Sequence, residues 1–114
     1  MKNTFELEHV GINTDNAGEA EQLALLLCKL FNLEPRHGQK SEFAGNYFEC
    51  MKSPFLGKNG HIAIGTTSVL RAKAYLESMG FEFDESTAKY KGEKMVAVYL
   101  KQEFGGFAVH LLQK

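Results

Sequence analysis

The sequence predicts an α+β fold of two tandem βαβββ modules, which form a curved mixed sheet with helices outside and a cleft inside. The first observation is an order of strand, helix and three strands that occurs twice, about 50 residues apart. The second is a similarity between EHVGINTDN (8–16) and NGHIAIGTTS (59–68). In both segments a histidine is followed by apolar and small or polar residues and then by threonine. The third is the length of 114 residues, which suits a single domain over 1–114. We expect modules at about 1–57 and 58–114, joined at LGKNG (56–60).

Composition excludes several functions. The chain is 44% hydrophobic and 24% charged, which is typical of a globular protein and unlike a disordered one. Its net charge is −1 without a block of like charges, so we expect no nucleic-acid partner. No apolar run is long enough to span a membrane, and MKNTFELEHV has no apolar signal region. We therefore expect a cytoplasmic protein, with Cys28 and Cys50 as buried reduced thiols, although a disulfide is possible in principle.

The first module begins with a predicted strand at 5–13. A helix is predicted over 17–31, where Asn16 can cap its start and Glu19 can act as reciprocal partner. Short extended segments around 33–38 and 41–45 precede a stronger strand at 46–51. One apolar stripe repeats at helical spacing along the helix: Ala20, Leu23, Ala24, Leu27, Leu30 and Phe31.

The second module repeats this order. A strand at 61–66 is followed by a helix that Thr67 or Ser68 can cap, and Gly80 marks the helix end. An extended segment at 81–91, a turn at 91–94 and strands at 95–100 and 106–113 complete the chain. The helix should bury one face, which consists of Val69, Ala72, Leu76 and Met79.

Strand alternation predicts which side chains face the cleft. One face of the strands carries the ionisable and small residues, while the opposite face is apolar and should pack under the helices. The expected cleft residues are His9, Gly11, Tyr47, Glu49, His61, Ala63, Gly65, Ala97, Tyr99, Ala108 and His110. The expected helix-side residues include Val10, Ile12, Ile62, Ile64, Val98 and Leu100.

The repeat also aligns four possible metal ligands. His9 and His61 stand in the opening strands, and superposing 45–52 on 106–113 places Glu49 over His110. Taken singly, a strand histidine is more often a core or rim residue than a ligand. Three imidazoles and one carboxylate together fit a divalent metal such as Zn, Ni, Co, Mn or Fe. His37, in the polar PRHG loop, is expected at the surface.

These features resemble the vicinal-oxygen-chelate superfamily, which includes glyoxalase, bleomycin-resistance and dioxygenase proteins. The resemblance covers essentially the whole chain, and NGHIAIGT, YLESMGFEF and GGFAVHLLQK carry it most clearly. The second half is similar to a small glyoxalase-like domain. That domain occurs alone or fused to 2-dehydro-3-deoxyphosphogluconate / 4-hydroxy-2-oxoglutarate aldolases.

The resemblance implies metal ligands on the first and last strands of each module, at His9, Glu49, His61 and His110. The last position is usually Glu in the superfamily, so His110 departs from the pattern.

We expect a metal site that chelates vicinal oxygens of a small keto- or hydroxy-acid for lyase or isomerase chemistry. Glu49 would be its catalytic base, and Tyr47 and Tyr99 could orient the substrate. The alternative is a non-catalytic small-ligand binding or accessory domain associated with a keto-acid aldolase. The family also implies a homodimer.

Overall fold

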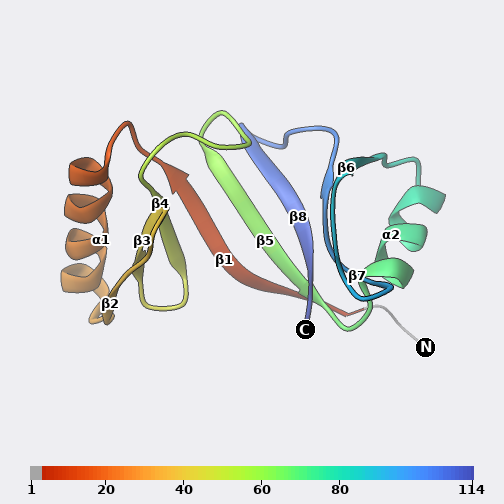
Figure 1. The fold of residues 1–114 in the computed structure, drawn as a ribbon, viewed down its shortest axis with the longest axis horizontal. Coiled ribbons are helices and arrows are strands. Elements are labelled where there is room, and N and C mark those ends of the chain that lie inside the picture. Colours follow the sequence, from red (N-terminus) through yellow and green to blue (C-terminus); the bar gives the residue numbers. More distant parts are fainter. Residues whose placement is uncertain (1–3) are drawn as a thin grey trace.

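The computed structural model describes residues 4–114 and has an α+β fold, with eight strands in one mixed sheet and two helices (Figure 1). The first half contains β1 (Phe5–Asn13), α1 (Ala17–Phe31), β2 (Pro35–His37), β3 (Ser41–Ala44) and β4 (Phe48–Met51). The second contains β5 (Gly60–Thr66), α2 (Val69–Ser78), β6 (Phe83–Lys91), β7 (Lys94–Leu100) and β8 (Phe107–Gln113).

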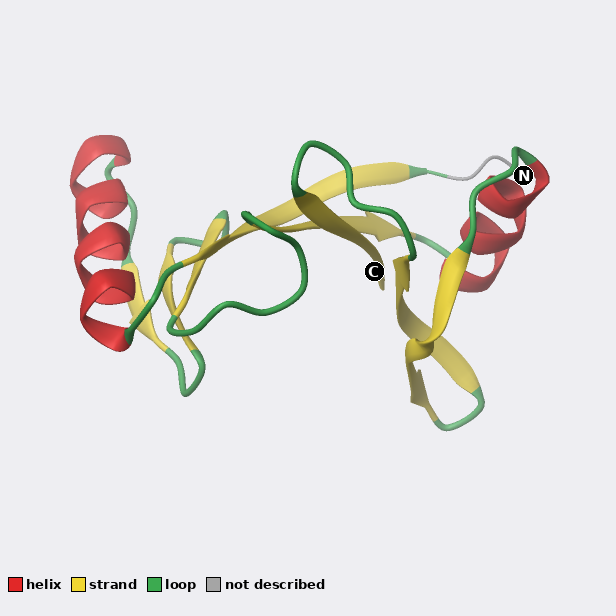
Figure 2. Cartoon of the chain, turned by 90° about the horizontal axis from the view of Figure 1, so that it is seen from above, coloured by secondary structure: helices red, strands yellow, loops and turns green. Residues whose placement is uncertain are grey.

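The strand order is β2-β3-β4-β1-β5-β8-β7-β6, so each half contributes four neighbouring strands. β1 pairs with β5 in antiparallel fashion at the centre. On either side the next pairings, β1 with β4 and β5 with β8, are parallel. The sheet is curved and the two helices lie at its opposite ends (Figure 2). The first and last strands of each half therefore lie together in the middle of the sheet.

Both helices begin at the predicted caps. The side chain of Asn16 accepts a hydrogen bond from the backbone N–H of Glu19, and Ser68 does the same for Arg71. The Glu19 carboxylate accepts from the N–H of Asp15 instead of returning to Asn16. Polar side chains thus satisfy helix-end donors at the predicted starts of α1 and α2.

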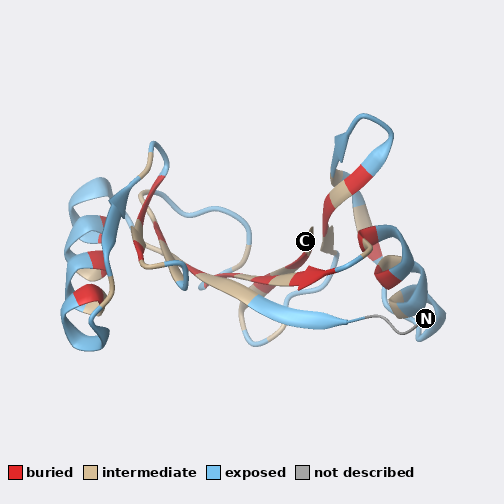
Figure 3. Cartoon of the chain, turned by 90° about the horizontal axis from the view of Figure 1, so that it is seen from below, coloured by how far each residue is buried: buried red, intermediate tan, exposed pale blue. Residues whose placement is uncertain are grey.

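The larger buried cluster lies in the second half, between α2 and the strands beneath it (Figure 3). Its members are Val69, Ala72, Phe83, Met95, Val98 and Leu111. Ile64 and Leu100 pack against it as strand alternation predicted, and Leu76 as helical spacing predicted. The cluster of the first half is smaller, with Ala20, Ala24 and Cys50 at its centre. The buried side chains of α1 are small, namely Ala20, Ala24 and Cys28, while Leu23 and Leu27 are partly buried beside them.

The predicted helix faces were wrong at three positions, since Leu30, Phe31 and Met79 are exposed. α1 packs mainly on β3 and β4, which have four residues each. A helix of 15 residues is about 22 Å long, whereas a four-residue strand covers about 13 Å. The last turn of α1 therefore extends beyond the strands. Met79 follows the last residue of α2 and has a non-helical backbone, so it leaves the buried face.

The prediction that Val10, Ile12 and Ile62 are covered by the helices was also wrong. α1 lies over β3 and β4, and α2 lies over β7 and β8, so β1 and β5 are left between them. The three side chains are consequently only partly buried.

Cys28 and Cys50 are buried free thiols, as predicted. Burial raises the pKa of the Cys50 thiol to about 11, so the thiol stays protonated at neutral pH. Within residues 4–114, no helix has both the length and the apolar character needed to cross a membrane.

Candidate metal centre

The structure brings together all four predicted ligands. His9 lies on β1, Glu49 on β4, His61 on β5 and His110 on β8, which are the four central strands. Each histidine offers a ring nitrogen, and the three nitrogens lie within 4.8 Å of one another. Glu49 Oε1 is 3.1 Å from His61 Nε2 and 3.4 Å from His9 Nε2. The two Nε2 atoms are 3.3 Å apart, so the donor atoms of both halves face a common point.

Small residues separate the ligands in the sheet. Gly11 on β1 is paired with Glu49 on one side and with His61 on the other. Ala63 on β5 is likewise paired with His9 and with His110. A Cβ atom added at Gly11 would lie 2.0 Å from Cε1 of His61, which is a direct clash. The imidazole therefore occupies the space that the glycine leaves open.

The two halves differ in exposure at this site. The side chains of His9 and Glu49 are 25% and 20% exposed. His61 and His110, from the second half, are buried. The cluster is therefore more open to solvent on the side of His9 and Glu49 than on the side of His61 and His110.

Ser41 holds the second oxygen of Glu49. Its buried hydroxyl donates to Glu49 Oε2 over 2.8 Å, so Oε1 is left to face the histidines. Hydrogen bonds from His61, His9 and Ser41 keep the pKa of Glu49 well below its usual range. The carboxylate is therefore an anion at neutral pH, as metal coordination requires.

His110 stacks on Tyr99, with ring centroids 4.4 Å apart and ring planes 10° from parallel. Burial, with a further effect from His61 and His9, lowers the pKa of His110 to about 3, so its imidazole is neutral. Its buried Nε2 has no hydrogen-bond partner in residues 4–114, and neither has Nδ1 of His61. An orphaned imidazole nitrogen beside two further imidazoles and a carboxylate fits a divalent transition metal.

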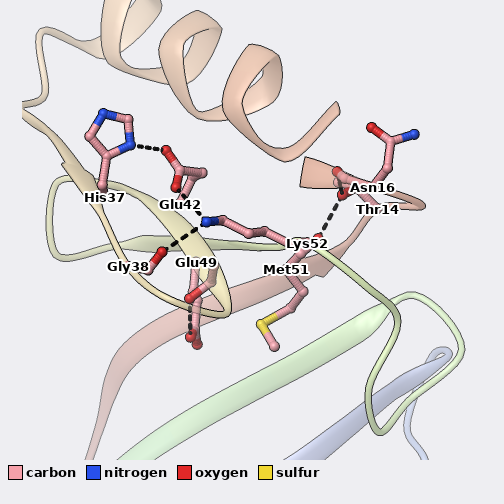
Figure 4. Close-up of polar contacts among 9 residues, drawn as sticks. Thr14, Asn16, His37, Gly38, Glu42, Glu49, Met51 and Lys52 are labelled. Atoms are coloured by element: carbon pink, nitrogen blue, oxygen red, sulfur yellow. Dashed lines mark hydrogen bonds and ion pairs between the residues drawn. The ribbon is translucent and has the colours of Figure 1, made fainter. Parts of the chain in front are cut away.

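A second group of possible ligands comprises Glu21, His37 and Glu42. There Lys52 already supplies a cation: its Nζ lies 3.3 Å from Glu42 Oε2 and donates to the carbonyl of Gly38 (Figure 4). His37 contacts the other oxygen of Glu42. This carboxylate is therefore neutralised within the chain, and we interpret the group as structural. The side chain of His37 is 77% exposed, which confirms the prediction that this residue lies at the surface.

Sequence reasoning missed Ser41 and Glu42, both of which are buried. They lie on the four-residue strand β3, which is too short to show a clear alternation. The orienting role predicted for Tyr47 stays a prediction. Tyr47 is in the turn before β4 and is largely exposed, and it lines a hollow together with His9 that Glu49 does not border. Tyr99 pairs with His110 and stacks on its ring, so it lies on the sheet face that carries the ligands, where the alternation placed it.

The comparisons with known proteins support the fold. No family model matches the chain. The search of curated proteins also gave no match. The crystal structure of the hypothetical protein BH1468 from Bacillus halodurans C-125 is similar, with a TM-score of 0.65 at 18% identity, and the match covers 97% of this chain and 95% of that one. At this identity the similarity extends to the α+β fold alone.

Proposed function

We propose that this chain is a glyoxalase-like metal-binding protein that chelates two neighbouring oxygens of a small keto- or hydroxy-acid. The observation that carries the proposal is the convergence of His9, Glu49, His61 and His110 without a balancing cation. No lysine or arginine of residues 4–114 forms an ion pair with Glu49. A divalent ion would supply the missing positive charge.

The arrangement of the strands supports an assignment to the vicinal-oxygen-chelate superfamily. Both halves follow the same order of elements, and their pairings correspond across the β1–β5 boundary. In this proposal the halves are two tandem βαβββ modules. Each module contributes one ligand from its first strand and one from its last.

The chemistry would divide between the ion and the chain. A bound divalent ion supplies Lewis acidity, which stabilises negative charge on vicinal substrate oxygens. Glu49 is the candidate base because it is ionised and lies on the open side of the cluster. Ser41 would orient its carboxylate, and Tyr99 would hold the ring of His110 in place.

One observation favours binding without turnover. Ser41 holds Oε2 of Glu49 and the histidines face Oε1, so both carboxylate oxygens are engaged and neither is free to take a proton from a substrate. The second candidate is therefore a non-catalytic module that uses the same metal to hold a small acid. Glu49 would then be a ligand only.

Metal analysis tests the proposal directly. Untagged protein should carry about one divalent ion per chain after loading and desalting. The variant His9→Ala/His61→Ala should carry little, whereas His37→Ala should match the wild type because His37 lies outside the cluster. If wild type and the double variant hold equally little metal, the proposal is wrong.

Turnover separates the two candidates. Enolisable 2-oxo acids, 2-hydroxy acids and glutathione hemithioacetals would be supplied to protein loaded with Ni, Co, Mn or Zn. Proton exchange or product formation that Glu49→Gln abolishes supports the enzyme. Binding of the same acids without any conversion supports the binding module.

A further inference from the structure

The hollow beside the metal centre has two lobes. The first lobe, of about 640 Å³, reaches Glu49, and the second, of about 480 Å³, reaches His110. Phe55 and Lys89 line both. A ligand held at the metal centre can therefore extend in either direction.

The two lobes differ in charge. The first is lined by Lys40, Lys52 and Lys89, and its only acidic residue is Glu49. In the second, Lys89 is the only lysine, arginine or acidic residue, and the other side chains are aliphatic, aromatic, hydroxyl-bearing or imidazole groups. The electrostatic potential of the first lobe is thus the more positive.

The three lysines are not equally available. Lys52 is engaged by Glu42 and by the carbonyl of Gly38, as Figure 4 shows. Lys40 and Lys89 make no side-chain ion pair or hydrogen bond in the part of the chain that the structure describes. They come from opposite halves, since Lys40 precedes β3 and Lys89 lies on β6. Two uncompensated ammonium groups therefore border one hollow beside the metal centre.

We propose that the first lobe is a subsite for a second anionic group of the ligand, a carboxylate or phosphate distal to the chelated oxygens, bound by Lys40 and Lys89. This inference rests on the proposed function and narrows its ligand class to acids with such a distal anion. Both lysines are exposed, so each ion pair with the distal anion should add only a modest amount of affinity. The second lobe has fewer cationic side chains and more apolar ones, and it accommodates an uncharged part of the same molecule.

The test uses matched acids and calorimetry on untagged, metal-loaded protein at low ionic strength. 2-Oxoglutarate and 2-oxopentanoate share the 2-oxo acid group and differ in the distal carboxylate. 3-Phosphoglycerate and glycerate form the corresponding pair for phosphate. We expect the member with the distal anion to bind roughly 5- to 20-fold more tightly, as two exposed ion pairs would give. The pair with the larger ratio identifies the anion, and added salt should reduce that ratio.

Variants assign the effect to the lysines. Lys40→Met and Lys89→Met should each weaken binding of the acid with the distal anion by about 2- to 5-fold and leave binding of its partner without that anion unchanged. Lys91→Met is the matched control, because Lys91 is also an exposed residue of β6 and lines neither lobe. It should leave both affinities unchanged.

The outcomes separate this subsite from the metal centre. If metal binds and both members of each pair bind equally, the subsite is wrong and the metal centre stands. The same holds if the preference persists in both lysine variants or is lost equally in Lys91→Met. If the wild type holds no metal and no acid, the proposed function fails, and the subsite fails with it.

Discussion

Glu42 and Glu49 lie on neighbouring strands, each beside histidine, yet their surroundings differ. Glu42 is buried against Lys52 and His37, so its charge is balanced inside the chain. Glu49 faces His61 and His9 and has no lysine or arginine as an ion-pair partner within residues 4–114. The residue types alone would suggest a metal at either place. The missing counter-charge and the unpartnered imidazole nitrogens distinguish the second.

The largest expected difference between the two sites appears when the carboxylate of Glu49 or of Glu42 is replaced by an uncharged amide. Glu49→Gln should lower metal affinity by more than roughly 100-fold, because a residue that binds the ion contributes more to affinity than a residue that only hydrogen-bonds to a ligand. Glu42→Gln should leave metal affinity unchanged but lower the free energy of unfolding by about 1–3 kcal/mol, because Lys52 loses its charged partner. Dye competition and urea denaturation measure the two effects. Equal loss of metal in both variants would contradict the distinction.

Gly11→Ala tests the space beneath His61. The new methyl group collides with the ring, so metal binding should be lost and stability should fall by about 1–3 kcal/mol. The double variant Gly11→Ala/His61→Ala removes the collision and should regain the stability without regaining metal. Urea denaturation of the metal-free proteins and metal titration measure both. Wild-type metal binding by Gly11→Ala would show that the ring moves freely.

Ser41→Ala removes the hydroxyl that holds Glu49 Oε2. We expect metal affinity to fall about 10- to 100-fold, as for other outer-shell partners, while the fold persists. Ser78→Ala is the control, since the Ser78 hydroxyl bonds only the backbone of α2 in the described structure. Chelator competition gives the affinities. An unchanged affinity in Ser41→Ala would mean that the histidines alone orient the carboxylate.

The smallest expected effect is the contribution of His110 to the pH dependence of the free energy of unfolding of the metal-free protein. Its folded pKa of about 3 lies below the unfolded value near 6.5, so the unfolded chain binds the extra proton between these pH values. Its contribution to stability is complete above about pH 6.5 and is lost as pH falls toward 3. Between pH 7 and 5.5 the loss should be about 1 kcal/mol.

His110→Phe removes this titration while keeping an aromatic ring against Tyr99. Its unfolding free energy should therefore depend less on pH over the same range, as urea denaturation at each pH would measure. At pH 7 the variant should be at least as stable as the wild type, because an unpartnered buried nitrogen is gone. Identical pH profiles would show that His110 is solvated.

The elements were largely predictable because their signals are local. Asn16 and Ser68 are capping residues followed by helical periodicity, and both helices begin there. The errors arose where a residue's environment depends on packing. Leu30 continues the helical stripe, yet it lies beyond the short strands that α1 covers. Ser41 and Glu42 became recognisable only through their contacts.

The sequence by itself determined the order of elements, in which strand, helix and three strands occur twice, and it predicted four candidate ligands, because both follow from residue spacing. Only the tertiary structure decided that the four meet within one chain, since that depends on the central pairing of β1 with β5. It also decided which carboxylate is neutralised. Lys52 is ten residues from Glu42 and three from Glu49, yet the folded chain places its ammonium group against Glu42.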